Sequence, residues 1–483
     1  MNVLSHLEPA SVFRYFEEIC SIPHTSYHEK ALSDYCVSFA KNHGYYWEQD
    51  ELGNVLIIAD ATDGYEEVEP VILQGHLDMV GDKTADCTLD LEKDGLELYI
   101  DGDLVRAKGT TLGADNGIAV AYALAVLDAD NIPHPRLEVV LTVSEEVGLI
   151  GASAMDLSSC KARKLINIDS EDEGIFTAGC AGGLRGWCTI PVNRAMKTGI
   201  ICNLSLTNLL GGHSGMEIHK GRANANVLMG RFLLTLDNAF SYGLLELSGG
   251  TKENVIPKES KAVILVSEKD LETLKQTAAD FQNDISVEYG TSDPKITLEL
   301  QIPDMEEEIE LVLDNPSLER VLTLLTLMPN GVQTMSADLP GLVESSLNNG
   351  VILLENDTFQ TRLSIRSSVA SIKKYIAAQA SQLTEFLGGS VDYAGDYPAW
   401  PYARESKLRD QCIAIYKEQY GQAPKIEMLH AGLECGIFSD KLPGLDCISF
   451  GPDLADVHTP NETMSISSVQ RVWEFLKALL AAK

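Results

Sequence analysis

Basic residues are scarce in this chain of 483 residues: 37 Lys and Arg stand against 71 Asp and Glu, which gives a formal net charge of −34. A field of this sign repels nucleic acid and anionic membrane surfaces, and it attracts cations. The chain also lacks any uninterrupted run of roughly 18 apolar residues, the length that a membrane-spanning helix needs. We therefore expect neither nucleic acid nor a membrane among its partners.

Signals for export and for disulfide bonding are missing as well. The N-terminal stretch MNVLSHLEPASVFRYFEEIC has no basic start and no long apolar core, the two features of a secretory signal. The ten cysteines are scattered, and no CxxC pair occurs among them. In a long chain without an export signal, this pattern predicts free and mostly buried thiols in a reducing cytoplasm.

Strand-like and helix-like segments alternate over residues 1–185. The apolar runs VEPVILQGHLDMV, PRLEVVLTVSEE and KLINIDSE have the composition of strands, and the alanine-rich segment GADNGIAVAYALAVLDAD has that of a buried helix. This βαβ order is typical of an α/β domain whose mostly parallel sheet is covered by helices.

The pattern changes over residues 186–390. Strand-like runs such as GVILLENDTFQTRLSIRSS are mixed there with amphipathic helical segments such as LETLKQTAADFQNDI. This mixture predicts an α+β domain built on an antiparallel sheet. Helix–strand units resume over residues 391–483, so we interpret the chain as a discontinuous α/β catalytic domain (1–185 and 391–483) that carries an α+β insertion (186–390).

Imidazole and carboxylate groups stand where the strands of the α/β domain end. In open α/β sheets, ligands bind beyond the carboxyl ends of the strands. Asp115 occupies a glycine-flanked turn that enters a helix, and His458 follows the last strand. Seven side chains share such positions: His76, Asp78, Asp115, Glu145, Glu146, Asp169 and His458.

Two histidines and three carboxylates match the ligand demand of two neighbouring zinc ions, because zinc binds neutral imidazole and carboxylate and keeps a position open for water. The adjacent pair Glu145–Glu146 has two interpretations. It is either a solvated strand end, or one side chain is a ligand while the other, which diverges from it, removes a proton from water. Asp78 lies on the same face as His76 and can orient its imidazole. Each signal alone also suits a structural role, whereas the ordered set favours a metal centre.

Longer strings resemble a known family. FEEICSIPHTSYHEKALSDY, GTTLGADNGIAVA, CAGG, GGHSGMEIHKG, HAGLECGIF and the His458 loop are similar to the di-zinc peptidase and amidase clan. Within that clan the chain resembles, over nearly its whole length, the aminoacyl-histidine dipeptidases, also called cytosolic non-specific dipeptidases or peptidase D. The resemblance implies hydrolysis of unblocked L-dipeptides with broad specificity, Xaa-His included, by a metal-bound water.

The resemblance also implies a role for each site residue. Asp115 would bridge two Zn²⁺ ions and form a cis peptide with the residue that follows it, and Co²⁺ or Mn²⁺ would suit the same ligands. His76 and Asp169 would hold one ion, and Glu146 and His458 the other. In the same scheme Glu145 is the general base and later the general acid, and Asp78 orients the first histidine.

Residues of the insertion and of the HAGLECG segment are candidates for substrate binding. The resemblance makes the insertion a lid, in which His213 of GGHSG stabilises the oxyanion; alternatively it is a turn histidine. Arg366 either pairs with the substrate carboxylate or is a surface strand residue. Asn254 either donates to the same carboxylate or oxyanion or simply sits at a strand edge. His430 and Glu434 follow another strand, and Glu434 either holds the substrate ammonium or caps a helix.

Three other functions compete with the dipeptidase interpretation. A clan relative that removes acyl groups from amino acids would use the same metal ligands. A non-catalytic, metal-dependent peptide-binding protein would require the loss of Glu145 or of a ligand, and none is missing. Tetrahedral aminopeptidases carry their extra domain between the first histidine and the bridging aspartate, whereas a short segment separates His76 from Asp115 here. In relatives, lid residues can come from a partner subunit, so a homodimer is one assembly that the resemblance implies.

Overall fold

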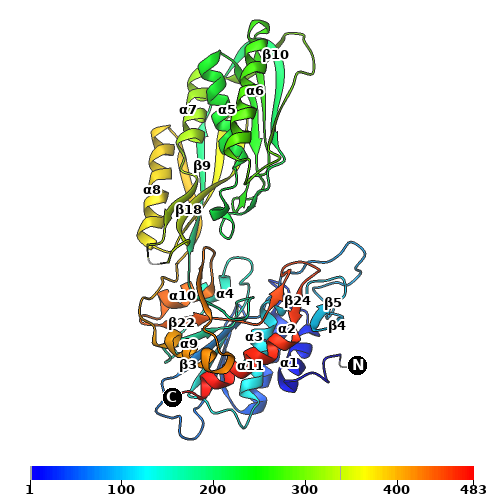
Figure 1. The fold of residues 1–483 in the computed structure, drawn as a ribbon, viewed down its shortest axis with the longest axis vertical. Coiled ribbons are helices and arrows are strands. Elements are labelled where there is room, and N and C mark those ends of the chain that lie inside the picture. The colour runs from blue at the N-terminus through cyan, green and yellow to red at the C-terminus, as the bar shows by residue number, and fades with distance from the viewer. Residues whose placement is uncertain (1–2, 338) are drawn as a thin grey trace. The chain divides into compact units, whose positions relative to one another are not determined.

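The chain divides into two compact units in the computed structural model, which describes residues 3–337 and 339–483 (Figure 1). Unit 1 comprises Met1–Cys180, Trp400–Met428 and Leu433–Lys483, and unit 2 comprises Ala181–Ala399 and Leu429–Gly432. The sequence places the second boundary at 390/391. The structure moves it to 399/400 because strand β20 (Ser390–Tyr397) pairs with β9 (Gly182–Pro191) of unit 2.

Unit 1 is built on an eight-stranded sheet in the order β1-β2-β6-β3-β7-β22-β8-β21. In that order the strands span Tyr46–Gln49, Val55–Ala59, Leu137–Thr142, Val71–His76, Lys164–Asn167, Asp446–Ser449, Ile175–Cys180 and Lys425–Leu429. The four central strands β6, β3, β7 and β22 run parallel. The predicted α/β domain with a mostly parallel sheet is confirmed. Outside the parallel centre, β2 runs antiparallel to both of its neighbours, β1 and β6, and β8 runs antiparallel to β22.

Helix α3 (Ala114–Leu127) is buried along nearly its whole length, which its alanine-rich sequence allows. It packs against β3 and against α1 (Ala10–Cys20). On another side, Tyr122 of α3 stacks on Trp473 of α11 (Ile466–Ala481), with ring centroids 6.0 Å apart. The remaining helices of unit 1 are α2 (Lys30–His43), α4 (Ile150–Ala154), α9 (Lys407–Tyr420) and α10 (Glu434–Lys441). A small second sheet joins β4 (Leu98–Asp101), β5 (Leu104–Ala107), β23 (Leu454–Ala455) and β24 (Thr463–Ser465).

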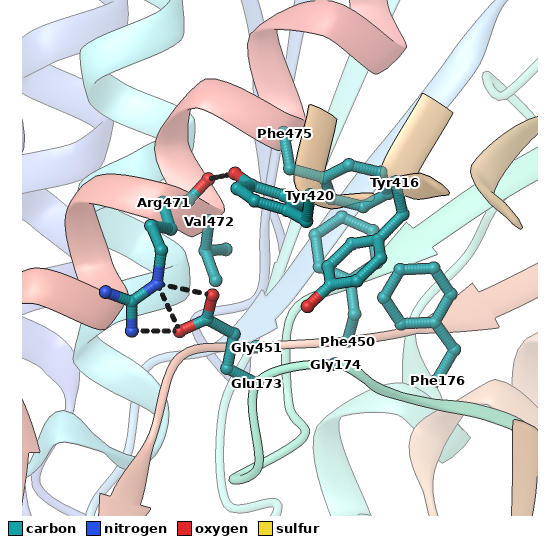
Figure 2. Close-up of a pocket in the computed structure, with 10 residues that line it drawn as sticks. All are labelled: Glu173, Gly174, Phe176, Tyr416, Tyr420, Phe450, Gly451, Arg471, Val472 and Phe475. Carbon is teal, nitrogen blue, oxygen red and sulfur yellow. Dashed lines mark hydrogen bonds and ion pairs between the residues drawn. The ribbon is translucent and has the colours of Figure 1, made fainter. Parts of the chain in front are cut away.

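Aromatic rings fix the start of the loop that follows β22. Figure 2 shows Phe450, the residue after that strand, among rings from β8, α9 and α11. Its ring centroid lies 4.9 Å from that of Phe475 and 5.6 Å from that of Phe176. Beside these rings, the Arg471 guanidinium makes a two-pronged ion pair with Glu173, from Nε to Oε1 and from Nη2 to Oε2. The chain therefore leaves β22 from a rigid point on its way to His458.

Unit 2 is an antiparallel sheet packed with helices, as the sequence predicts. The described part of its main sheet has ten strands, eight of them in the order β15-β10-β14-β12-β18-β19-β9-β20, with β16 on β10 and β17 on β18. A separate two-stranded sheet pairs β11 (Gly212–His213) with β13 (Val255–Ile256). Strands not yet given are β10 (Arg194–Thr207), β12 (Gly243–Gly249), β14 (Ser260–Val266), β15 (Thr297–Gln301), β16 (Glu308–Leu313), β17 (Gly331–Met335), β18 (Val343–Leu354) and β19 (Thr358–Ser367). The helices are α5 (Ala225–Ala239), α6 (Leu271–Glu288), α7 (Asn315–Leu327) and α8 (Ala370–Phe386), labelled in Figure 1.

The structure also bears on the cysteines and on the expected lack of a membrane-spanning helix. All ten cysteines are free and nine are buried, Cys87 being half-buried, which confirms the predicted free thiols. Among the described residues, no helix combines the length and the apolar character needed to cross a bilayer.

Candidate active site

The carboxyl ends of neighbouring strands deliver the predicted ligands to one edge of the unit 1 sheet. His76 is the last residue of β3, and Asp169 lies two residues beyond the end of β7. Glu145 and Glu146 follow β6 closely, and Asp115 is in the first turn of α3. Because β6, β3 and β7 are parallel neighbours, their ends meet at the same edge.

Asp115 is shared between the two histidines. Its Oδ1 lies 3.2 Å from His76 Nε2, and its Oδ2 lies 3.2 Å from His458 Nε2. His76 Nε2 is also 3.5 Å from Asp169 Oδ1, and His458 Nε2 is 2.8 Å from Glu146 Oε1. Each imidazole thus faces the central carboxylate and one further carboxylate. This arrangement matches two adjacent sites that have one ligand in common.

Three groups at this edge bring one ligand atom per residue to within 4.8 Å of one another. The groups are His76–Asp115–Asp169, His76–Glu145–Glu146 and Asp115–Glu146–His458. Each group offers one imidazole and two carboxylates, which is the donor chemistry that zinc and similar divalent ions accept. The residues present therefore fit a pair of metal ions.

The electrostatics of the edge point to the same conclusion. Burial is the main cause that raises the pKa of Asp169 to about 6; the charges of Asp115 and Glu146 act in the same direction, and His76 opposes them. Burial also raises the pKa of Glu145 well above its usual range, again with help from nearby carboxylates. Hydrogen bonds with Asp115 and Glu146 raise the pKa of His458 to about 11. Divalent cations would neutralise the crowded carboxylates and leave the imidazoles neutral to act as ligands.

Asp78 is buried and has more partners than the sequence indicates. The His76 Nδ1 atom lies 2.9 Å from the Asp78 backbone oxygen and 3.4 Å from its Oδ1. The carboxylate accepts the backbone N–H groups of Glu145 (2.8 Å) and Glu146 (3.2 Å). Asp78 is thus placed both to orient the first histidine and to hold the turn that carries the two glutamates.

Sequence reasoning missed two other residues that shape this edge. Asn116 accepts the His76 backbone N–H at 3.1 Å and donates from Nδ2 to the Ile168 carbonyl at 2.6 Å, so it ties β3 and β7 together. Glu29 accepts the backbone N–H of Ser144 at 2.8 Å, where the backbone is left-handed (φ 53°). The sequence could have indicated Asn116, because it stands next to Asp115. It offers no such local indication for Glu29, because the partner Ser144 lies 115 residues away. The Asp115–Asn116 peptide is cis, as expected.

Residues 72–482 match the model of peptidase family M20/M25/M40. The chain belongs to this peptidase family. It is therefore a peptide hydrolase. It is 39% identical over 482 residues to the cytosol non-specific dipeptidase of Escherichia coli (strain K12), covering 99% of each chain.

Solved structures agree with this membership. The aminoacylhistidine dipeptidase of Vibrio alginolyticus superposes with a TM-score of 0.91 and 38% identity, covering 99% of this chain and 97% of that one. These relatives confirm the predicted resemblance to aminoacyl-histidine dipeptidases. The aminopeptidase PepT of Bacillus cereus shares the fold at a TM-score of 0.56 and 14% identity, covering 98% of both chains.

Glu434 of this M20-family chain lies beneath the strand ends at the start of α10. Its side chain is fully buried, and Oε2 accepts hydrogen bonds from Thr142 Oγ1 (2.7 Å) and from Gln74 Nε2. Burial raises the pKa of Glu434 to about 7. The other oxygen, Oε1, has no hydrogen-bond partner among the described residues. Glu434 thus joins β3 to β6 and retains one free acceptor.

Unit 2 gathers the other four predicted substrate residues around one glycine. A Cβ atom at Gly215 would lie 3.0 Å from His213 Cε1, 3.2 Å from Arg366 Nε and 2.5 Å from the His430 carbonyl oxygen. Asn254 belongs to the same cluster, because its carbonyl accepts the backbone N–H of residue 214 at 2.9 Å. Only glycine leaves room for this approach of three functional groups.

The protonation of the two histidines in this cluster follows from their contacts. His213 Nδ1 accepts the Met216 backbone N–H at 3.1 Å, so a neutral imidazole carries its proton on Nε2. Burial lowers the pKa of His213, and the positive charge of Arg366 lowers it further. Burial and the same charge lower the pKa of His430 to about 3. Both rings are therefore neutral at neutral pH.

Free hydrogen-bonding atoms remain in this cluster. Arg366 donates from Nη1 to Tyr397 Oη at 3.0 Å, and His430 Nε2 lies 2.7 Å from Ser346 Oγ. Among the described residues, the buried Arg366 Nε and His430 Nδ1 have no hydrogen-bond partner. Buried polar atoms rarely stay unpaired, so these two suit the binding of a polar ligand.

Proposed function

We propose that this chain is a zinc-dependent cytosolic dipeptidase that hydrolyses unblocked L-dipeptides with broad specificity, Xaa-His included. The observation that carries the proposal is Asp115, which lies between His76 and His458 with Glu145 at the same edge. The names of the relatives, a cytosol non-specific dipeptidase and an aminoacylhistidine dipeptidase, support the substrate class.

The predicted ligands would hold two Zn²⁺ ions, or Co²⁺ or Mn²⁺ in their place. The five residues concerned are His76, Asp115, Glu146, Asp169 and His458. When bound, the metal would polarise the scissile carbonyl and make a water molecule more acidic. The chain's contribution is to fix these donors at one edge before any substrate arrives.

Glu145 is our candidate for the general base. The Nε2 atoms of the two imidazoles face Asp115, Asp169 and Glu146, and Asp78 lies at Nδ1 of His76. Glu145 is in none of these pairs, although it lies at the same edge. A carboxylate at this edge suits a group that first takes a proton from water and then returns it to the leaving amine. The Asp78 carboxylate would keep it in place through the Glu145 backbone N–H.

Recognition of the two free ends of a dipeptide would fall to the remaining predicted residues. The Arg366 guanidinium and the Asn254 amide suit the substrate carboxylate, and His430 offers its free Nδ1 beside them. Because His213 Nδ1 accepts the Met216 N–H, the Nε2–H of the neutral ring is the donor that would suit the oxyanion. The free oxygen of Glu434 suits the ammonium group.

A panel of free and N-acetylated dipeptides tests the substrate class. We expect rapid cleavage of free dipeptides, such as Ala-His and Ala-Leu, and little cleavage of their N-acetyl forms, because an acetyl group removes the ammonium charge. Faster cleavage of the acetylated peptides would favour an N-acyl-amino-acid deacylase. Zinc-dependent peptide binding without any turnover would favour a non-catalytic protein.

The Glu145→Gln variant tests the proposed base. General acid–base catalysis typically contributes about 10²–10⁴-fold, so we expect kcat to fall by that factor while zinc content, measured by elemental analysis, stays near that of the wild type. The surface variant Glu51→Gln serves as the control and should keep full activity. Unchanged turnover in Glu145→Gln would remove this residue from the mechanism.

The homodimer remains a prediction, which sedimentation analysis can test.

A further inference from the structure

Glu462 is a buried carboxylate outside the proposed ligand set, with 3% of its surface exposed. It lies four residues after His458 in the chain. Its two oxygens accept the four consecutive backbone N–H groups of residues 112–115, at 2.7, 3.0, 2.9 and 3.3 Å. The last of these N–H groups belongs to Asp115, the carboxylate shared by the two histidines.

This contact differs from ordinary helix capping. The first N–H groups of a helix have no partner within the helix, and a side chain from the preceding few residues usually accepts them. For α3, the N-cap Gly113 has no side chain to do so. The acceptor comes instead from a residue 347 to 350 positions later in the chain. The backbone of Asp115 and Asn116 is not helical, so these four N–H groups belong to the turn that leads into the regular part of α3.

Glu462 is itself held firmly on the side of His458. Its backbone N–H donates to the Thr459 carbonyl at 3.1 Å, and Thr459 Oγ1 donates to the Asp456 carbonyl at 2.7 Å. The next three residues form β24, which pairs with β5 and β23. Local hydrogen bonds thus hold the turn that carries His458, and the strands on both sides of it, β23 and β24, pair with each other.

We propose that Glu462 is a positioning residue that sets the separation of Asp115 and His458, and with it the geometry of the proposed metal pair. The inference rests on the proposed metal centre. Asp115 and His458 each lie in a turn rather than within a strand. The Glu462 side chain hydrogen-bonds the turn that carries Asp115, and Glu462 itself belongs to the same segment as His458. Outer residues that orient metal ligands typically affect metal affinity or activity by about 10–100-fold.

A matched control exists in the same unit. Glu138 is also buried, and its carboxylate accepts the backbone N–H groups of Lys161 and Ala162 and the Arg136 Nε–H. It lies near the start of β6, at the end of that strand away from Glu145. Glu138→Gln therefore disturbs a buried carboxylate–backbone network of the same kind without touching the ligand turns.

The experiment compares wild-type protein with the variants Glu462→Gln and Glu138→Gln after removal of metal by a chelator. Zinc affinity is measured by competition with a chromophoric chelator, and folding by circular dichroism. We expect Glu462→Gln to bind at least one zinc ion about 10–100-fold more weakly. Excess zinc should largely restore its kcat with KM unchanged. Glu138→Gln should keep wild-type affinity.

Several outcomes would overturn the inference. One is a folded Glu462→Gln variant with wild-type zinc affinity, and another is an equal loss of affinity in both variants. If Glu462→Gln does not fold, the shorter but charged Glu462→Asp variant replaces it. We expect this variant to lose part of its zinc affinity, and an affinity equal to that of the wild type would refute the inference.

The measurement also separates this inference from the proposed function. Wild-type protein that binds zinc but cleaves no dipeptide would refute the dipeptidase proposal, while the Glu462 variants would still decide the positioning role. Wild-type protein that binds none of Zn²⁺, Co²⁺ and Mn²⁺ would refute both.

Discussion

Replacing Gly75 with alanine tests the close packing that places His76. Gly75 precedes the histidine at the end of β3 and faces α3. An added Cβ would lie 2.6 Å from the Ala119 Cβ atom and 2.6 Å from Asn116 Oδ1. Real Cβ atoms essentially never approach other heavy atoms below 3.0 Å. One of the two elements must therefore move.

Neither neighbour yields easily. Ala119 is fixed in the middle of a buried helix. Asn116 is held at both ends of its amide, by the His76 N–H (3.1 Å) and by the Ile168 carbonyl (2.6 Å). Overpacking a core typically costs about 1–3 kcal/mol. Loss of the hydrogen bond to His76 adds about 0.5–1.5 kcal/mol. We therefore expect Gly75→Ala to reduce the free energy of unfolding by roughly 2–4 kcal/mol.

The Gly117→Ala variant, on the same helix, provides the control with the opposite sign. Its added Cβ would lie 3.5 Å from Ile19 Cγ2 and 3.5 Å from Phe16 Cε2, which are ordinary contact distances. Alanine is favoured over glycine inside a helix by about 0.8–1.0 kcal/mol. We expect Gly117→Ala to be as stable as the wild type or more stable by up to about 1 kcal/mol.

Urea unfolding of both variants, followed by fluorescence and circular dichroism, measures the difference. The Gly75→Ala transition should move to lower urea, and its kcat should fall because the displaced strand end carries His76. A Gly75→Ala protein as stable as the wild type would refute the described packing of β3 on α3. So would a shift of the same sign and size in both variants.

Three further predictions follow from the same structure. Chelation of metal should abolish peptide hydrolysis, and added Zn²⁺ should restore it; full activity of metal-free protein would contradict the proposed centre. Under native conditions a thiol reagent should label about one cysteine rapidly, and Cys87→Ser should remove that reaction, because the other nine thiols are buried. Asp293 accepts the backbone N–H groups of Leu210 and Ala223, both at 2.7 Å, on either side of the His213 loop. Asp293→Asn should therefore destabilise unit 2 by about 1.5–3 kcal/mol and lower kcat with zinc content unchanged, as denaturation and elemental analysis can show.

The sequence by itself determined the α/β class, the α+β insertion and the edge at which the predicted ligands gather. Hydrophobic period and strand–helix order are local properties, and the carboxyl ends of parallel strands converge whatever the details of packing. His76, Glu146 and Asp169 could therefore be assigned to one site from their positions at strand ends. The family strings then added a role for each of them.

Only the tertiary structure decided which residues support that site. Asn116, Glu29 and Glu462 act through hydrogen bonds to backbone groups that are distant in the chain, and no local pattern records such a partner. The same holds for the cluster of His213, Arg366 and other groups around Gly215, because that cluster depends on how separate strands and loops pack. Periodicity reports which face of an element is buried, whereas the partner of a buried carboxylate is fixed only when the elements come together.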